Sequence, residues 1–174
     1  MQNIRTEDLG HGVTVYTDAD HRIGTDACLL AAFAAPRKID TACDLGTGCG
    51  IIPLLWFSTE SPPQTAYALE LQPDAAELAR SGVAHSGLGE RLHIIEGDIR
   101  DLPDILPRGG FDLVTCNPPY KPVGAGVLSG SESGKIASWN CSSRNLIKPS
   151  VNQAEASFGS SRVSSSKQSA ASLR

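Results

Sequence analysis

Short apolar segments alternate with helical patterns from residue 41 onward. Segments typical of buried strands occur in "TACDLG", "TAYALEL", "RLHIIEGD" and "FDLVTCNPPY". The first three are followed by stretches with helical character, "GIIPLLWFS", "PDAAELARSGVAHSG" and the shorter "IRDLPDIL". Strands that alternate with helices form right-handed βαβ crossovers. The pattern therefore predicts an α/β fold, in which a parallel sheet carries helices on both faces.

The region before residue 41 has a different pattern. "GVTVYT" alternates apolar and polar residues, which predicts a short strand or one arm of a hairpin. "ACLLAAFAA", residues 27–35, predicts a helix that Thr25 or Asp26 caps and Pro36 ends. This apolar run is far too short to span a bilayer. The first ten residues contain no apolar signal-peptide core, so we expect a cytoplasmic protein without membrane association.

Composition changes near residue 138. The chain has 174 residues and a net charge of −4, which argues against a broad basic surface for nucleic acid. Residues 138–174 contain 12 serines, five basic residues and one acidic residue, so this part carries +4 and the remainder −8. We therefore predict a folded region over 1–137 and a serine-rich, disordered tail over 138–174. The five cysteines show no paired metal-ligand spacing, so we expect reduced thiols and no metal.

The segment "DLGTGCG", residues 44–50, has the pattern of a nucleotide-binding turn between a strand and a helix. Its glycines, Gly46, Gly48 and Gly50, do not fit the G-x-G-x-x-G spacing of dinucleotide-binding folds. Asp44, two residues before the first glycine, would repel a pyrophosphate but suits a ligand with an amino or sulfonium cation. We therefore predict S-adenosylmethionine as the cofactor, with a purely structural glycine turn as the alternative.

Polar side chains end the other predicted strands. Glu70 ends the second strand and can accept hydrogen bonds from two ribose hydroxyls. Asp98 follows the third strand, where it can accept an adenine amine, while Ile99 can pack on the adenine ring. The alternative role of Asp98 is to cap the next helical turn, which is compatible with cofactor contact. Asn117 ends the fourth strand. Parallel strands end at one edge of the sheet, so we expect these residues to face one ligand there.

The fourth strand stops at Asn-Pro-Pro-Tyr, residues 117–120. Prolines lack the N–H that a central strand needs, so the strand cannot continue through them. One interpretation is a plain Asn-Pro turn in which Tyr120 packs against the protein.

Taken together, these motifs resemble the class I S-adenosylmethionine-dependent methyltransferases, which have a Rossmann-like fold. More narrowly, the chain is similar to those members with an Asn-Pro-Pro-Tyr motif, which methylate planar amino groups. The resemblance implies that the Asn117 side chain and the Pro118 carbonyl accept hydrogen bonds from the target amine, that the prolines keep these acceptors rigid, and that Tyr120 stacks on a flipped-out base. The catalytic residues that it implies are Asn117, Pro118, Pro119 and Tyr120.

Two further stretches narrow the resemblance to the bacterial tRNA-valine (adenine-N6)-methyltransferases. They are "HRIGTDACLLAAF" and the loop "NPPYKPVGAGVLSGSESGKIA". This family implies tRNA as the partner, and it places Asp26 or the Thr25 backbone over the cofactor. We expect a monomer. The predicted cofactor-binding residues are Thr25, Asp26, Asp44, Gly46, Thr47, Gly48, Gly50, Glu70, Leu71, Asp98, Ile99 and Asn117.

The sequence departs from this family after Ala137. The family sheet has seven strands in the order 3-2-1-4-5-7-6, of which the pattern here supplies four. We expect that a frameshift or a mispredicted splice replaced the remainder, which leaves a domain that is truncated after its fourth strand. A bare strand edge and exposed apolar surface would make the chain poorly stable and impair its activity. The alternatives are methylation of adenine N6 in rRNA or DNA, methylation of glutamine N5 in protein, or a non-catalytic cofactor-binding fragment.

Overall fold

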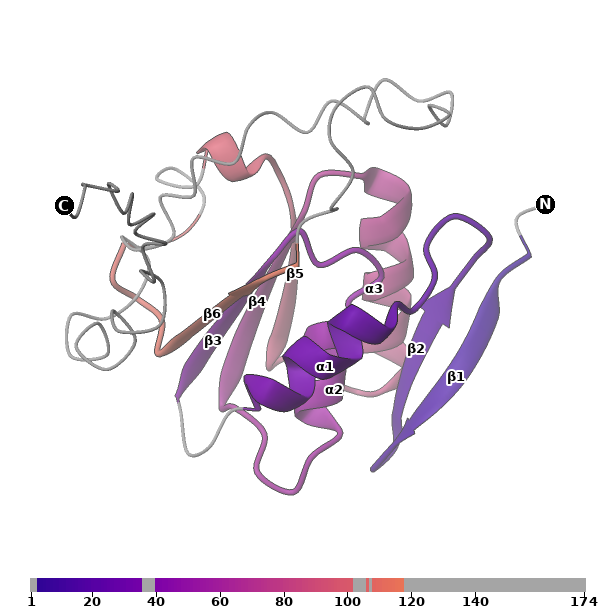
Figure 1. Ribbon diagram of the computed structural model, residues 1–174, viewed down its shortest axis with the longest axis horizontal. Coiled ribbons are helices and arrows are strands. Elements are labelled where there is room, and N and C mark those ends of the chain that lie inside the picture. Colours follow the sequence, from indigo (N-terminus) through magenta and orange to yellow (C-terminus); the bar gives the residue numbers. More distant parts are fainter. Residues whose placement is uncertain (1–2, 36–39, 102–105, 107, 118–174) are drawn as a thin grey trace, which may run out of the picture.

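The computed structural model describes residues 3–35, 40–101, 106 and 108–117 (Figure 1). Its main element is a parallel sheet of four strands in the order β5-β4-β3-β6. This order is the 3-2-1-4 arrangement that the resemblance implied, and it confirms the parallel α/β sheet. The bounds of its strands are Thr41–Leu45 for β3, Thr65–Glu70 for β4, Leu92–Glu96 for β5 and Leu113–Cys116 for β6.

Three α-helices lie on one side of the sheet, and a hairpin packs against α3 beyond them (Figure 1). The apolar cluster between these layers includes Val15, Leu54 and Trp56, which are almost completely buried. A second cluster around Leu45, Leu69 and Phe111 covers the other face of the sheet. The helices are α1 (Thr25–Phe33), α2 (Ile51–Phe57) and α3 (Pro73–His85), and a 3-10 turn, η1 (Ile99–Asp101), follows β5.

The N-terminal hairpin consists of β1 (Arg5–Gly10) and β2 (Val13–Thr17), which confirms the strand predicted over "GVTVYT". The loop residues His11 and Gly12 both have positive φ, 52° and 77°. A two-residue hairpin turn of type I′ needs positive φ at both positions, because its twist then matches that of the strands. The β2 strand leads into the segment 18–24, which connects the hairpin to α1.

Helix α1 begins differently from the prediction. Gly24 is its N-cap residue, and no side chain caps the helix. The N–H of Cys28 already donates to the carbonyl of Gly24 at 3.3 Å, so Thr25 and Asp26 lie inside the first turn. The prediction that Thr25 or Asp26 caps this helix was therefore wrong. Pro36, the predicted stop, lies outside the described residues.

The hairpin docks on α3 through a close backbone approach. A Cβ atom at Gly82 would lie 2.9 Å from the Thr14 carbonyl oxygen and 3.1 Å from a methyl carbon of Leu54. The Ser86 hydroxyl accepts a hydrogen bond of 2.9 Å from the Thr14 N–H and donates one of 2.7 Å to the Gly82 carbonyl. A glycine is therefore required where α3 meets β2.

We predict that Gly82→Ala destabilises the fold by about 1–3 kcal/mol, because the methyl group must displace the backbone of β2. Urea unfolding followed by circular dichroism measures the change. Gly89→Ala is the matched control, since Gly89 is exposed and has open space around its Cα. Equal stability of the two variants would contradict the close packing of hairpin and helix.

Candidate functional site

The carboxyl ends of β3 and β4 meet at the glycine turn. Gly46 and Thr47 both donate backbone hydrogen bonds to the Leu69 carbonyl at the end of β4, at 2.8 and 3.0 Å. Gly46, Gly48 and Gly50 have φ values of 71°, 59° and 80°. L-residues rarely adopt these conformations, and glycine adopts them without steric cost. The sequence therefore needs its glycines here to turn the chain sharply from β3 into α2.

Glu70 fixes this turn from the neighbouring strand. One carboxylate oxygen accepts a hydrogen bond of 2.8 Å from the Gly48 N–H, and the other accepts one of 2.9 Å from the Gln72 N–H. The residue is 6 % exposed. Each oxygen keeps a further lone pair, so Glu70 can still accept hydrogen bonds from ligand hydroxyls.

Asp44 is fully buried at the end of β3. Its Oδ1 accepts a hydrogen bond of 2.7 Å from the Thr115 hydroxyl on β6. Among the described residues, its Oδ2 and the Thr47 hydroxyl have no hydrogen-bond partner. Burial raises the pKa of Asp44 to about 7, although the hydrogen bond from Thr115 and the nearby Thr47 hydroxyl lower it, and the charge of Glu70 raises it further. A donor that reaches Oδ2, directly or through a water, would satisfy this carboxylate.

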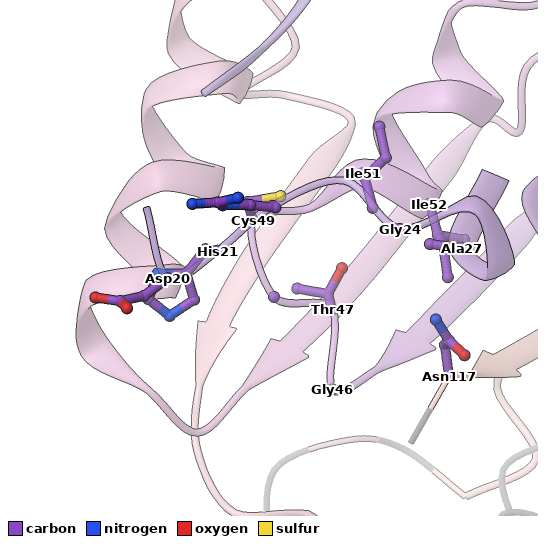
Figure 2. Close-up of a pocket in the computed structure, with 12 residues that line it drawn as sticks. Asp20, His21, Gly24, Ala27, Gly46, Thr47, Cys49, Ile51, Ile52 and Asn117 are labelled. Atoms are coloured by element: carbon purple, nitrogen blue, oxygen red, sulfur yellow. The ribbon is translucent and has the colours of Figure 1, made fainter. Parts of the chain in front are cut away.

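A cavity of about 260 Å³ lies between the glycine turn, Asn117 and the segment between β2 and α1. Figure 2 shows Thr47 between Asn117 on one side and the Asp20 and His21 side chains on the other. Burial raises the pKa of the Cys49 thiol in its wall to about 11, so this thiol is protonated at neutral pH. The lining residues are Asp20, His21, Arg22, Gly24, Ala27, Gly46, Thr47, Gly48, Cys49, Ile51, Ile52 and Asn117.

The structure brings most of the predicted site residues to this edge of the sheet. Gly46, Thr47, Gly48 and Asn117 line the cavity, and Glu70 contacts the glycine turn directly. Thr25 and Asp26 are exposed at the start of α1, where their neighbours Gly24 and Ala27 line the cavity. Gly50 is the N-cap residue of α2, and Leu71 is exposed after β4. The predicted residues Pro118, Pro119 and Tyr120 lie outside the described residues.

Asp98 and Ile99 follow β5, two strands away from β3. The N–H of Gly97 donates to the Glu70 carbonyl at 2.9 Å, which places the end of β5 beside the end of β4. The Asp98 carboxylate pairs with Arg100, and this hydrogen-bonded ion pair lowers the pKa of Asp98. It also accepts a hydrogen bond of 2.8 Å from the Arg100 N–H, so it caps η1 as one interpretation predicted. Ile99 packs against the second apolar cluster.

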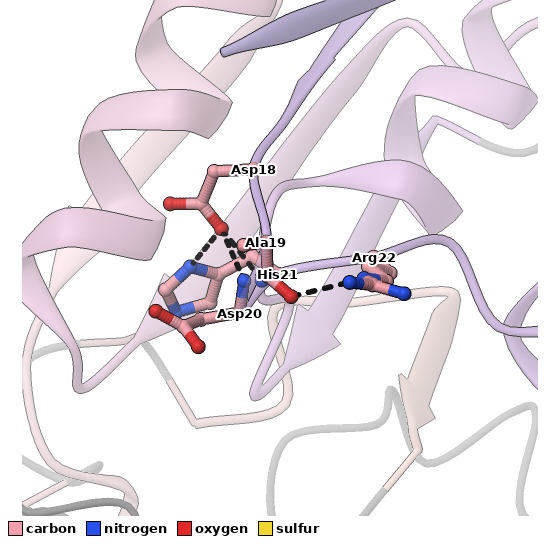
Figure 3. Close-up of polar contacts among 5 residues, drawn as sticks. All are labelled: Asp18, Ala19, Asp20, His21 and Arg22. Atoms are coloured by element: carbon pink, nitrogen blue, oxygen red, sulfur yellow. Dashed lines mark hydrogen bonds and ion pairs between the residues drawn. The ribbon is translucent and has the colours of Figure 1, made fainter. Parts of the chain in front are cut away.

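Sequence reasoning missed the polar network of the segment 18–24 (Figure 3). The buried Asp18 carboxylate accepts hydrogen bonds from the N–H groups of His21 and Asp20 at 2.7 and 2.9 Å, and contacts the His21 ring at 3.0 Å. Arg22 donates to the Ala19 carbonyl at 2.9 Å. Burial alone would raise the pKa of Asp18, but these bonds hold it below its ordinary value. The acidic and basic residues of "DADHR" are the sequence feature from which this network could have been predicted.

Comparisons with known proteins agree with this architecture. Residues 36–150 match the family described as "Methyltransferase domain". Because this match covers more than half of the chain, the protein belongs to that family. The crystal structure of PH0793 from Pyrococcus horikoshii matches with a TM-score of 0.51 at 13 % identity, over 66 % of this chain and 42 % of that one, which supports the Rossmann-like fold.

Two curated relatives carry the same name, tRNA1(Val) (adenine(37)-N6)-methyltransferase. The protein from Porphyromonas gingivalis W83 is 39 % identical over 105 residues, which are 57 % of this chain and 41 % of the relative. The protein from Yersinia enterocolitica is 34 % identical over 99 residues, which are 57 % of this chain and 39 % of the relative. The chain therefore spans about two fifths of the length of these relatives.

The described part of the chain contains neither a membrane-spanning helix nor a metal-binding group. Its helices include none long and apolar enough to cross a membrane. Its His, Cys, Asp and Glu side chains form no group of three or more that could hold a metal ion.

We predict that Asp18→Ala destabilises the fold at pH 7 by about 1–3 kcal/mol, because the backbone N–H groups of Asp20 and His21 lose a charged acceptor. The pKa of Asp18 is lowered on folding, so its contribution is complete above the unfolded-state pKa of about 4 and is lost as the pH falls through the folded-state pKa. The stability difference between variant and wild type should therefore shrink between pH 5 and pH 2.

Urea unfolding at a series of pH values measures this difference. Asp20→Ala is the control, since Asp20 is exposed and only its backbone N–H takes part in the network. A stability difference for Asp18→Ala that stays constant down to pH 2 would show that its charge contributes nothing.

Proposed function

We propose that this chain binds S-adenosylmethionine at the carboxyl edge of β3, β4 and β5, and that it belongs to an enzyme that methylates the exocyclic N6 amino group of adenine in tRNA. The observation that carries the proposal is the cavity that the glycine turn and Asn117 share. The names of the two curated relatives support the choice of substrate.

The donor set of the site fits this cofactor. Among the described residues, the Oδ2 atom of the buried Asp44 carboxylate has no hydrogen-bond partner, and the Thr47 hydroxyl lies nearby. This arrangement favours a ligand that donates hydrogen bonds and carries positive charge. The amino-acid end of S-adenosylmethionine, with its ammonium group, meets both requirements, whereas a phosphate would be repelled. Glu70 would accept hydrogen bonds from the ribose, and Asp98 or Ile99 would contact the adenine.

Bound S-adenosylmethionine supplies a methyl group on a positively charged sulfur, which makes the carbon electrophilic. Asn117 would accept a hydrogen bond from the target amine and so hold the nitrogen facing the cavity. The acceptor site would be completed by the rigid Pro118 and Pro119, and by Tyr120, which would stack on the target base. The site needs no strong base, because the amine becomes a strong acid once it is methylated and can release its proton to water.

Transfer assays with isotopically labelled S-adenosylmethionine test the substrate. We expect the label in N6-methyladenosine of tRNA at a low rate, and a decrease of about 100-fold or more for Asn117→Ala, which removes the positioning acceptor. Binding of S-adenosylhomocysteine by this variant should change little. Label in rRNA, DNA or the glutamine of a release factor would contradict the tRNA assignment.

We predict opposite effects of Asp44→Asn on stability and binding. The pKa of Asp44 is raised on folding, so its ionisation opposes folding increasingly as the pH rises from about 4 to about 7. At pH 8 the variant should be more stable than the wild type, by up to about 4 kcal/mol for a shift of about three pKa units. Its affinity for S-adenosylhomocysteine should fall by about tenfold or more, because a charged partner of the ammonium group is lost.

Thermal unfolding and calorimetry at pH 8 measure the two quantities. Asp74→Asn is the control, because Asp74 is an exposed acid in the first turn of α3 and should change each quantity only slightly. Unchanged binding by Asp44→Asn would contradict the proposed role of Asp44.

A further inference from the structure

Thr115 is a buried hydroxyl residue on β6, which is an end strand of the described sheet. It lies on β6 directly opposite Asp44 in the β3–β6 register, and it is 5 % exposed. Its hydroxyl is 2.7 Å from Asp44 Oδ1 and 3.5 Å from the Cys43 carbonyl oxygen. The single proton of this hydroxyl therefore goes to the carboxylate, which is the closer acceptor and the charged one.

We infer that Thr115 is a positioning residue: its hydroxyl fixes the orientation and the charge of the Asp44 carboxylate, and thereby presents Oδ2 to the ammonium group of the ligand. The identity of that ligand rests on the proposed function. The effect on Asp44 itself does not, because it follows from the contact between the two side chains.

A residue that only filled space in this strand would not need a hydroxyl. Valine has nearly the same shape as threonine and needs no hydrogen-bond partner, so it would fill a buried strand position at least as well. The hydroxyl instead occupies one oxygen of Asp44. The carboxylate cannot then rotate freely, and its second oxygen remains without a partner among the described residues.

The charged groups around Asp44 make this bond important for its ionisation. Burial is the main influence that raises its pKa, and the Glu70 carboxylate on β4 adds to this effect. Thr115 from β6 and Thr47 from the glycine turn oppose it. The Cys43 thiol on β3 stays neutral because burial and Asp44 raise its pKa, and Cys116 on β6 is a further thiol nearby. Helix α2, "IIPLLWF", contributes no titratable group.

Thr115→Val tests the inference in the full 174-residue chain. Carboxyl ¹³C NMR of aspartate-labelled protein follows the ionisation of Asp44, and the loss of one resonance in Asp44→Asn assigns the signal. In Thr115→Val, we expect the midpoint of the Asp44 ionisation to rise from about 7 by about one to two pH units, because the charged carboxylate loses a hydrogen bond. Thr115→Ser, which keeps the hydroxyl, should restore the wild-type midpoint, and Thr115→Ala should reproduce the shift.

Thr41→Val is the matched control. Thr41 lies at the opposite end of β3, where its hydroxyl donates to the Gly110 carbonyl at 2.8 Å and also reaches the Asp112 carboxylate at 3.2 Å. This variant removes a hydroxyl that also links β3 to the β6 region. It should lower stability and leave the Asp44 midpoint where it is.

The binding of S-adenosylhomocysteine gives a second measurement. The dissociation constant of Thr115→Val should exceed that of the wild type by about fivefold or more at pH 7, and by less than about twofold at pH 9, where Asp44 is at least about half ionised in both. Because the two dissociation constants are compared at the same pH, the protonation of the ligand affects both equally and cancels in their ratio. Binding of 5′-methylthioadenosine, which lacks the amino-acid end, should show no such difference.

An unchanged Asp44 midpoint in Thr115→Val would overturn the inference, as would a binding ratio that does not depend on pH. If the wild-type chain binds no S-adenosylhomocysteine, the proposed function fails. The NMR comparison of Thr115→Val with Thr41→Val still decides the role of Thr115 in that case.

Discussion

The buried carboxylate of Asp44 is the constraint on which the site depends. A charged group without solvent contact is tolerated only where neighbouring groups offset its desolvation. The sheet order supplies one such group by placing Thr115 of β6 opposite Asp44, and the glycine turn brings Thr47 close to it. The remaining acceptor, Oδ2, has no partner within the described residues. Stability is thus reduced at the position where a cationic ligand would restore it, as is common in functional sites.

Neighbouring strand ends hold the turn that surrounds this carboxylate. Leu69 accepts two backbone hydrogen bonds from the turn, and Glu70 accepts a third from Gly48. On the other side of the cavity, Asp18 organises the segment that leads into α1. The N-terminal hairpin positions that segment through its close contact with α3 at Gly82. The site is therefore built from strand ends of the sheet and from a hairpin that lies outside it.

The strand-end residues of the proposed cofactor site lie within the part of the chain that matches the methyltransferase-domain family. The family match covers residues 36–150, and the glycine turn, Glu70, Asp98 and Asn117 all fall within it. The segment 18–24 precedes this match and still lines the cavity, so the N-terminal region contributes to the cavity in addition to the residues within the family match. The chain spans about two fifths of the length of its curated relatives, whose names specify a tRNA adenine as the methylated group.

The sequence by itself determined the elements of the sheet and most of the residues that gather at its carboxyl edge. Apolar strand patterns, glycines and polar strand ends are local signals, and all four strands and the residues Asp44, Gly46, Gly48, Glu70 and Asn117 follow from them. Only the tertiary structure decided which side chains meet. Strand register pairs Thr115 with Asp44, although 71 residues separate them, and a one-residue shift would move Thr115 to the opposite face. The hydrogen bonds of Asp18 and the close contact at Gly82 likewise depend on backbone positions in space, which no local pattern of residues specifies.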